Sequence, residues 1–239
     1  FLIFAAGISF AYEVWKRLRI VMKGSGSLPL DRIRDRLWRT FREVFIHERV
    51  IRDRFWPGLM HALVFWGFLV FGLVTVDHFT IGFGISLFPE AAKHVYTIVA
   101  ISFAFMVMIG ILSLAYRRFI IRPPTLGKLS MTSGLVTIFI TLLMVSYIFG
   151  EIALPVDFAK INWWLHSLII LAFLVLIPRS KHLHLVFAPF NIFFRPFNTP
   201  DHKTVSIDLD VEEEELDAML SDLTRLTKNQ ALDIFSCVE

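Results

Sequence analysis

Five long apolar stretches dominate the chain, and shorter polar segments separate them. The stretches lie at about residues 1–21, 57–78, 95–115, 131–150 and 162–187. A hydrocarbon layer about 30 Å thick needs about 20 apolar residues per helix, and each stretch comes close to that length. The pattern predicts an all-α integral membrane protein in which five transmembrane helices form a bundle.

Two polar regions lie outside these spans. Between about residues 29 and 52, apolar side chains recur at helical spacing while arginines occupy the opposite face, which predicts a helix along the membrane interface. Residues 197–239 are polar and include a short predicted helix at Leu216–Leu226. We therefore expect a membrane domain over residues 1–196, followed by a cytoplasmic tail.

Basic residues predict the orientation of the spans. Residues 16–54 hold 12 of the 24 Lys and Arg residues and the segment 116–130 adds four, whereas residues 79–93 and 151–160 hold one each. Loops rich in Lys and Arg stay in the cytoplasm, so we expect the N-terminus outside and the tail inside. This rule accounts for the net charge of +3, and the chain carries no recognition module for nucleic acid.

Two of the predicted spans carry a histidine near each end: His61 and His78 on the second, His166 and His184 on the fifth. Ionisable side chains inside a membrane are costly and usually mark function. On antiparallel helices, residues whose numbers add up to the same value lie at the same depth, which matches His78 with His166 and His61 with His184. Imidazole is a usual axial ligand of haem iron, so the pattern predicts a haem-binding bundle with two b-type haems.

Three other histidines have weaker positions. His94 opens the third span and is the alternative to His78 as the outer ligand. His182 is turned by about 160° from His166 on a continuous helix, so we expect it to bond a haem propionate or to lie at the interface. His47 lies on the predicted interfacial helix, where we expect a solvated or interfacial side chain.

The last span resembles that of a known family. Residues 164–166 (Trp-Leu-His) and 180–189 (Ser-Lys-His-Leu-His-Leu-Val-Phe-Ala-Pro) resemble the final helix of the respiratory nitrate reductase gamma subunit, a dihaem quinol-oxidising membrane anchor. The resemblance implies that His166 and His184 are axial ligands and leaves His182 out.

The second span departs from that family. Residues 58–61 (Gly-Leu-Met-His) resemble the position of the family's first ligand, which implies that role for His61. The family's second ligand on this helix follows after a shorter spacing, where this chain has Phe71. The assignment of His78 therefore depends on the depth match alone.

The end of the chain resembles a larger family. Residues 222–224 and 231–239 are similar to the stretch that enters the first ferredoxin motif of proteins in which such a membrane domain is fused to two cluster motifs and a domain like that of heterodisulfide reductase. Electron-transfer-flavoprotein:menaquinone oxidoreductases are members. The resemblance implies [4Fe–4S] clusters beyond residue 239, with Cys237 as the first ligand. A reduced cytoplasmic thiol is the alternative, because one cysteine cannot complete a cluster.

These resemblances imply electron transfer in a bacterial or archaeal cytoplasmic membrane, from an electron-transfer flavoprotein through cytoplasmic clusters and two haems to menaquinone or another quinone. Quinone reduction needs a proton donor on the outer side, for which Asp77, Glu151, Asp157 and His94 are candidates. A quinol-oxidising subunit of a heterodisulfide-reductase-like complex would run the same parts in reverse. A haem-free proton or ion carrier and a passive membrane anchor are the alternatives from other classes.

Overall fold

A computed structural model describes residues 1–127, 129–151, 155–197 and 226–236 of the chain. Over these residues every regular element is a helix, and one isolated bridge joins Ser25 to Thr227. The predicted all-α class is therefore confirmed. The chain divides into two compact units, a first unit formed by Phe1–Ile46 with Leu171–Glu239 and a second unit formed by His47–Ile170.

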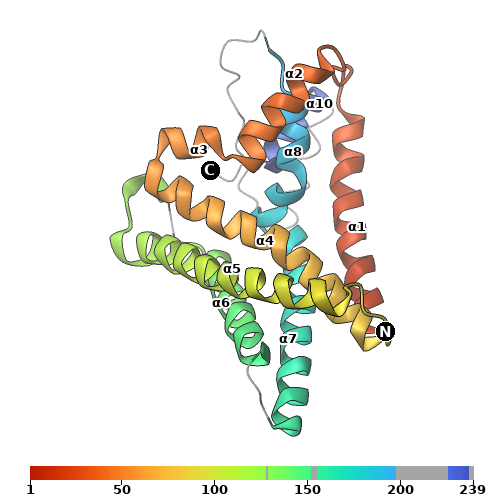
Figure 1. Cartoon of the computed structure of the whole chain (residues 1–239). Coiled ribbons are helices and arrows are strands. Elements are labelled where there is room, and N and C mark those ends of the chain that lie inside the picture. Colours follow the sequence, from red (N-terminus) through yellow and green to blue (C-terminus); the bar gives the residue numbers. More distant parts are fainter. Residues whose placement is uncertain (128, 152–154, 198–225, 237–239) are drawn as a thin grey trace. The chain divides into compact units, whose positions relative to one another are not determined.

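The second unit is built from long apolar helices. They are α4 (Phe55–Gly82), α5 (Glu90–Tyr116), α6 (Met131–Glu151) and the larger part of α7 (Val156–Leu176), and a short helix α3 (Glu48–Asp53) precedes them. Helix α5 packs against both α4 and α6 (Figure 1). Each of α4, α5 and α6 thus packs against its neighbour in the sequence.

Glycines allow α4 and α5 to approach each other closely. A Cβ atom at Gly67 would lie 1.9 Å from Cγ2 of Val107, and one at Gly110 would lie 2.8 Å from the carbonyl oxygen of Met60. Small residues at helix crossings are typical of membrane bundles, where packing rather than the hydrophobic effect holds the helices together. By contrast, nothing lies within 4 Å of a Cβ atom at Gly72.

Four helices in the described part of the chain are long and apolar enough to cross a membrane: Phe55–Gly82, Glu90–Ile121, Met131–Glu151 and Val156–Arg179. Large apolar side chains such as Trp66, Leu73 and Val76 lie exposed on α4, a distribution that suits contact with lipid. The chain is accordingly a multi-pass membrane protein. The second to fifth predicted spans all have a counterpart among these helices, although the observed helices are longer at most ends.

The first predicted span forms a helix, but its crossing of a membrane is not confirmed. Helix α1 runs from Leu2 to Lys23 and matches the predicted length. Its second half carries five charged residues, Glu13, Lys16, Arg17, Arg19 and Lys23, and it is not among the four apolar helices. Arg17 pairs with Glu13 at 2.5 Å, and Arg179 lies 3.3 Å from the same carboxylate.

The fifth predicted helix, 162–187, is broken in the structure. Helix α7 ends at Leu176, two 3-10 turns follow at Ile177–Arg179 and Lys181–Leu183, and α8 runs from His184 to Phe194. Pro178 lies at the break, where its ring and its missing N–H oppose a continuing α-helix. His166 and His184 therefore lie on different helices, and the predicted rotation of His182 relative to His166 does not apply.

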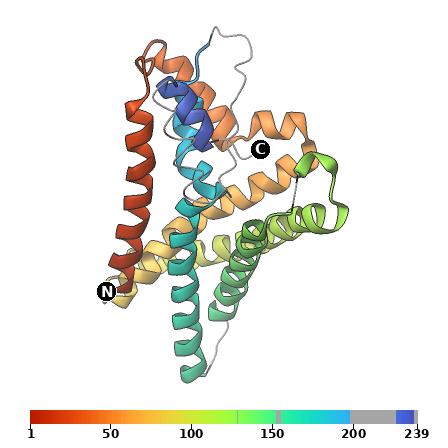
Figure 2. The ribbon, with the colours of Figure 1, turned by 180° about the vertical axis from the view of Figure 1, so that it is seen from behind.

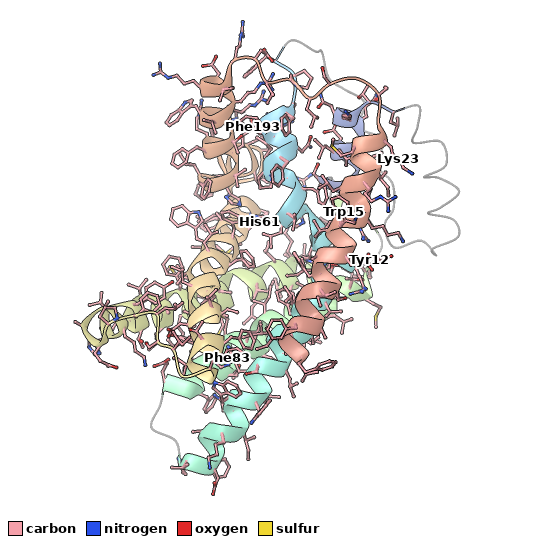
Figure 3. All side chains as sticks on the ribbon, turned by 90° about the vertical axis from the view of Figure 1, so that its right-hand side faces the viewer. Tyr12, Trp15, Lys23, His61, Phe83 and Phe193 are labelled. Atoms are coloured by element: carbon pink, nitrogen blue, oxygen red, sulfur yellow. The ribbon has the colours of Figure 1, made fainter. Side chains whose placement is uncertain are left out.

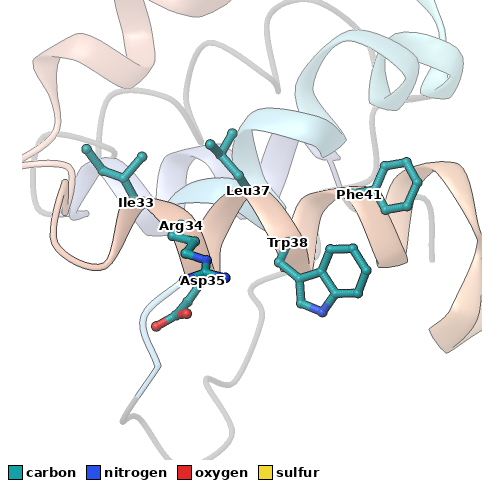
Figure 4. A pocket seen from close by; sticks show the side chains of 6 residues that line it. All are labelled: Ile33, Arg34, Asp35, Leu37, Trp38 and Phe41. Carbon is teal, nitrogen blue, oxygen red and sulfur yellow. The ribbon is translucent and has the colours of Figure 1, made fainter.

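The predicted interfacial helix, 29–52, is also interrupted. Helix α2 (Ile33–Thr40) continues as a π-helical turn, Phe41–Phe45, before α3 begins at Glu48. His47 stands between them with a left-handed backbone, φ +56°, which ends the helical path. Ile33 and Leu37, one turn apart, point to the same side of α2 and line an open depression with Trp38 and Phe41 (Figure 4).

The first unit has its own apolar core around the first turns of α8. Leu183 and Phe187 pack there with Val21 of α1 and with Leu232 and Phe235 of α10 (Lys228–Ser236). Figure 2 shows α10 beside α8, and Asn191 donates a hydrogen bond to Ser236 at 2.6 Å. The predicted helix at Leu216–Leu226 lies almost wholly outside the described residues, as does Cys237.

Candidate functional site

The structure brings two of the four candidate ligands together in the second unit. His78 on α4 and His166 on α7 have ring centroids 5.2 Å apart, with their planes inclined at 61°. His166 is only 7% exposed, and His78 is half-buried. The pairing of these two residues by depth thus corresponds to a direct side-chain contact between two apolar helices.

A serine on a third helix holds His166. Ser146 of α6 lies 2.7 Å from Nδ1 of His166 through its Oγ atom, and the same Oγ lies 2.7 Å from the carbonyl oxygen of Leu142. A hydroxyl has one hydrogen, and the helix carbonyl can only accept it. Nδ1 of His166 must therefore donate to Ser146, which leaves the ring's lone pair on Nε2.

His78 is held by its other ring nitrogen, Nε2. Its Nε2 lies 2.8 Å from Oγ of Ser167, whose hydroxyl donates to the carbonyl oxygen of Trp163 at 2.8 Å. By the same count of hydrogens, Nε2 of His78 carries the proton and Nδ1 carries the lone pair. The indole of Trp163 stacks on the His78 ring at 5.0 Å with a 19° inclination.

The second pair of candidate ligands is divided between the units. His61 lies near the start of α4, well before Phe83 at the end of that helix (Figure 3). His184 belongs to the first unit, where its Nδ1 donates to the carbonyl oxygen of Lys181 at 2.9 Å. That bond also leaves the lone pair on Nε2, the nitrogen with which histidine usually binds metal. The pairing of His61 with His184 stays a prediction.

His47 differs from its expected place at the interface. It is 5% exposed, and its ring lies 5.2 Å from that of His61 and 4.8 Å from that of Phe65. The expectation of a solvated or interfacial side chain is wrong because the break before α3 turns His47 toward α4. No spacing rule in the sequence signals this contact, since the left-handed residue at the break is not glycine.

The remaining histidine candidates lie in different surroundings. His94 is exposed in the first turn of α5, so the structure does not bring it into the pair that His78 forms with His166. His182 lies beside His184, with ring centroids 6.1 Å apart, and its Nδ1 is 3.1 Å from Oγ of Ser180.

The carboxylate candidates also differ from one another. Asp77 is buried, and its Oδ1 accepts a hydrogen bond from the backbone N–H of Leu87 at 2.9 Å, which is a loop-fixing contact. Glu151 interacts with Tyr147 and Lys93 at the end of α6, and Asp157 is exposed in the first turn of α7. Of these three, Glu151 is the one whose carboxyl interacts with a tyrosine hydroxyl.

Sequence reasoning missed the residues that hold the histidine pair. Ser146, Ser167 and Trp163 are small or aromatic residues inside apolar stretches, where such residues are common for packing alone. Ser167 and Trp163 could have been found from the sequence, because they lie within three residues of His166 on the same helix. Ser146 could be found only from the packing of α6 against α7.

Two curated relatives match the chain along nearly all of its length. The chain is 28% identical, over an alignment of 261 positions that covers 96% of it and 36% of the relative, to a probable iron-sulfur-binding oxidoreductase, FadF, of Bacillus subtilis (strain 168). It is 23% identical over 274 positions, covering 96% of it and 37% of the relative, to the EtfAB:quinone oxidoreductase of Syntrophomonas wolfei subsp. wolfei. No family model and no solved structure matches.

Both relatives are named as oxidoreductases, so the likeness supports an oxidoreductase family for this chain at modest identity. The chain spans little more than a third of the length of each relative.

Proposed function

We propose that this chain is the membrane part of a quinone-linked oxidoreductase, and that His78 and His166 hold a b-type haem in it. The observation that carries the proposal is the contact between these two imidazoles, which come from two apolar helices and have ring centroids 5.2 Å apart. A pair of polar rings placed inside such a unit is costly, and coordination of iron offsets that cost.

The residues present fit a haem iron. His166 presents Nε2 as its unprotonated nitrogen because Ser146 fixes the proton on Nδ1. His184 does the same through Lys181, which supports its assignment with His61 to a second haem on the cytoplasmic side. Haem bound at these places would supply one-electron carriers within the hydrocarbon layer.

The names of the relatives support the rest of the proposal. One is named as iron-sulfur-binding and the other as an EtfAB:quinone oxidoreductase. We propose that this chain works with [4Fe–4S] clusters, of which Cys237 would supply the first ligand, and with an electron-transfer flavoprotein as donor and menaquinone or another quinone as acceptor. Quinol oxidation within a heterodisulfide-reductase-like complex uses the same residues in reverse.

The proton required at the quinone has one favoured source. Among the outer candidates, Glu151 shares a hydrogen bond with Tyr147 and is influenced by the positive charge of Lys93, and a hydroxyl bonded to a carboxyl offers a path for a proton. Oδ1 of Asp77 is bonded to the backbone N–H of Leu87, and Asp157 is exposed in the first turn of its helix. We therefore assign proton delivery to Glu151.

The test is an optical spectrum of the full-length protein, purified in detergent and reduced with dithionite, for the natural chain and for His166→Ala. Two b-type haems per chain are expected in the natural protein and about half that pigment in the variant, because one of two iron sites loses a ligand. His94→Ala is the matched control, since His94 is exposed, and it should keep both haems. Full pigment in His166→Ala would contradict the assignment, and a colourless natural protein would favour the proton or ion carrier.

A further inference from the structure

We propose that Ser146 is a positioning residue for His166, and that it fixes which ring nitrogen of His166 faces the iron. The inference rests on the proposed haem at His78 and His166 and goes beyond it, because it assigns a role to a residue of α6, a helix that supplies no ligand. Its physical basis is that the buried hydroxyl group of Ser146 has one hydrogen, which it already donates to a backbone carbonyl oxygen.

The first observation is the environment of the Ser146 hydroxyl. Ser146 is 5% exposed and His166 7%, so neither polar group exchanges its partner with bulk water. The Ser146 hydrogen is directed at its own helix, with carbonyl oxygens of Leu142 at 2.7 Å and Leu143 at 3.1 Å. Only the lone pairs of Oγ remain for His166, so Ser146 accepts and the ring donates from Nδ1.

The second observation is that Ser146 is itself held against α7. Its carbonyl oxygen accepts a hydrogen bond from Nδ2 of Asn162 at 2.9 Å. Asn162 and His166 are four residues apart, so they lie on the same face of α7. Ser146 is thus bound to α7 at two consecutive turns, once through its backbone and once through its hydroxyl. This double contact fixes the depth and the rotation of α6 against α7 at the position of the ligand.

The third observation is the contrast with His78. Its Nε2 donates to Ser167, so this ring must exchange that bond before Nε2 can bind a metal. His166 needs no such change. The two rings of the pair therefore have different tasks: His166 is set in advance by Ser146, and His78 adapts when the site is filled.

A hydrogen bond to Nδ1–H raises the basicity of Nε2 as a metal ligand. A more basic ligand favours the oxidised iron, so removal of the bond favours the reduced form. For Ser146→Ala we expect the reduction equilibrium of the affected haem to shift about tenfold toward the reduced form, which for one electron is a rise of about 59 mV. The affinity for that haem should fall by roughly tenfold.

The experiment is a redox titration of the full-length protein, followed by optical spectra and by the low-spin electron paramagnetic resonance signal of the oxidised form. The component that shifts in Ser146→Ala should be the one missing from His166→Ala. Ser146→Thr keeps a hydroxyl and should restore the natural potential. Ser102→Ala is the matched control, because Ser102 makes the same kind of bond, to Ile98 at 2.9 Å, on an exposed face of α5. It should leave both potentials unchanged.

The outcomes separate the inference from the proposed function. If His166→Ala keeps both haems, the haem assignment itself fails. If His166→Ala loses one haem while Ser146→Ala leaves both potentials and the resonance signal as they are, the ligand assignment stands and the role of Ser146 is overturned. The same holds if Ser146→Thr behaves like Ser146→Ala.

Discussion

Arg36 of α2 is a buried arginine that donates hydrogen bonds to Asp31, Phe193 and Arg195 of the first unit. It is 1% exposed, and its nitrogens lie 2.9 Å from the carbonyl oxygen of Phe193, 3.0 Å from that of Arg195 and 2.7 Å from a carboxylate oxygen of Asp31. The two carbonyls lie at the end of α8, where helix acceptors lack partners within the helix. Arg36 therefore closes the C-terminus of the helix that begins with His184.

Replacing Arg36 should weaken the first unit strongly. In Arg36→Met the carbonyls of Phe193 and Arg195 keep only the bonds from Arg39, at 3.2 Å and 2.5 Å, and we expect a loss of roughly 1–3 kcal/mol in the free energy of unfolding. Arg34→Met is the control, because Arg34 is exposed on the same helix and should change stability little. Unfolding in a series of SDS fractions measures both. Equal stability of the two variants would contradict the role of Arg36.

The hydrogen bond from Arg36 also favours the ionised form of Asp31. The hydrogen bond from Arg36 lowers the pKa of the Asp31 carboxyl below its usual 3.8. A lowered pKa in the folded state adds stability above the unfolded value, and this part is lost as the pH falls through the folded value. Because Asp31 is fully exposed, the effect of this carboxyl on stability is small beside that of the buried arginine.

Residue number translates directly into height only along an unbroken helix. His78 and His166 each lie inside one unbroken helix, so their depth match corresponds to a contact in the structure. His184 lies beyond Pro178, where this translation no longer holds. The partner Ser146 comes from a third helix, and its position depends on packing that a single sequence does not contain.

At the scale of the helix, two glycines of α4, Gly67 and Gly72, have opposite surroundings. Gly67 faces Val107 with no room for a side chain, whereas Gly72 has open space. Gly67→Ala should cost about 1–3 kcal/mol through overpacking of α4 against α5. Gly72→Ala should be neutral or stabilise by up to about 1 kcal/mol, because alanine favours the helix more than glycine.

Thermal unfolding in detergent compares these two variants. The double variant Gly67→Ala with Val107→Ala supplies a further check, because a smaller side chain at residue 107 makes room for the new methyl group. Recovery in the double variant supports the contact. Equal melting temperatures of Gly67→Ala and Gly72→Ala would argue against it.

Element-level prediction from the sequence was good for apolar helices and poor for their interruptions. Apolar length identifies α4, α5, α6 and α7, since a helix of this kind needs no partner to satisfy its backbone. The break after Leu176 has a visible cause in Pro178. The break at His47 has none, because the left-handed residue is not a glycine and its ring contact is with His61, 14 positions further along the chain.

At the scale of the molecule, the orientation of the spans is still a prediction from charge. We expect the loop between α4 and α5 outside and the loop between α5 and α6 in the cytoplasm, because only the latter is rich in arginine. In a Cys237→Ser background, Ser86→Cys should react with an impermeant maleimide in intact cells. Leu129→Cys should react only after permeabilisation.

The same assay decides the number of spans. If α1 crosses the bilayer, Leu2→Cys should label from the outside together with Ser86→Cys. Labelling of Leu2→Cys only in permeabilised cells would show that the charged residues of α1 keep the helix on the cytoplasmic side, and that the four apolar helices are the whole set within the described residues.

Helix α10 packs against α8, although the two helices are far apart in the sequence. Phe235 packs near Phe187 with ring centroids 5.7 Å apart, although Phe197 and Lys228 are separated by thirty positions of chain. Both partners belong to one polypeptide, so their encounter is intramolecular. Dilution cannot separate them. The contact of α10 with the helix of His184 therefore does not depend on protein concentration or on diffusion.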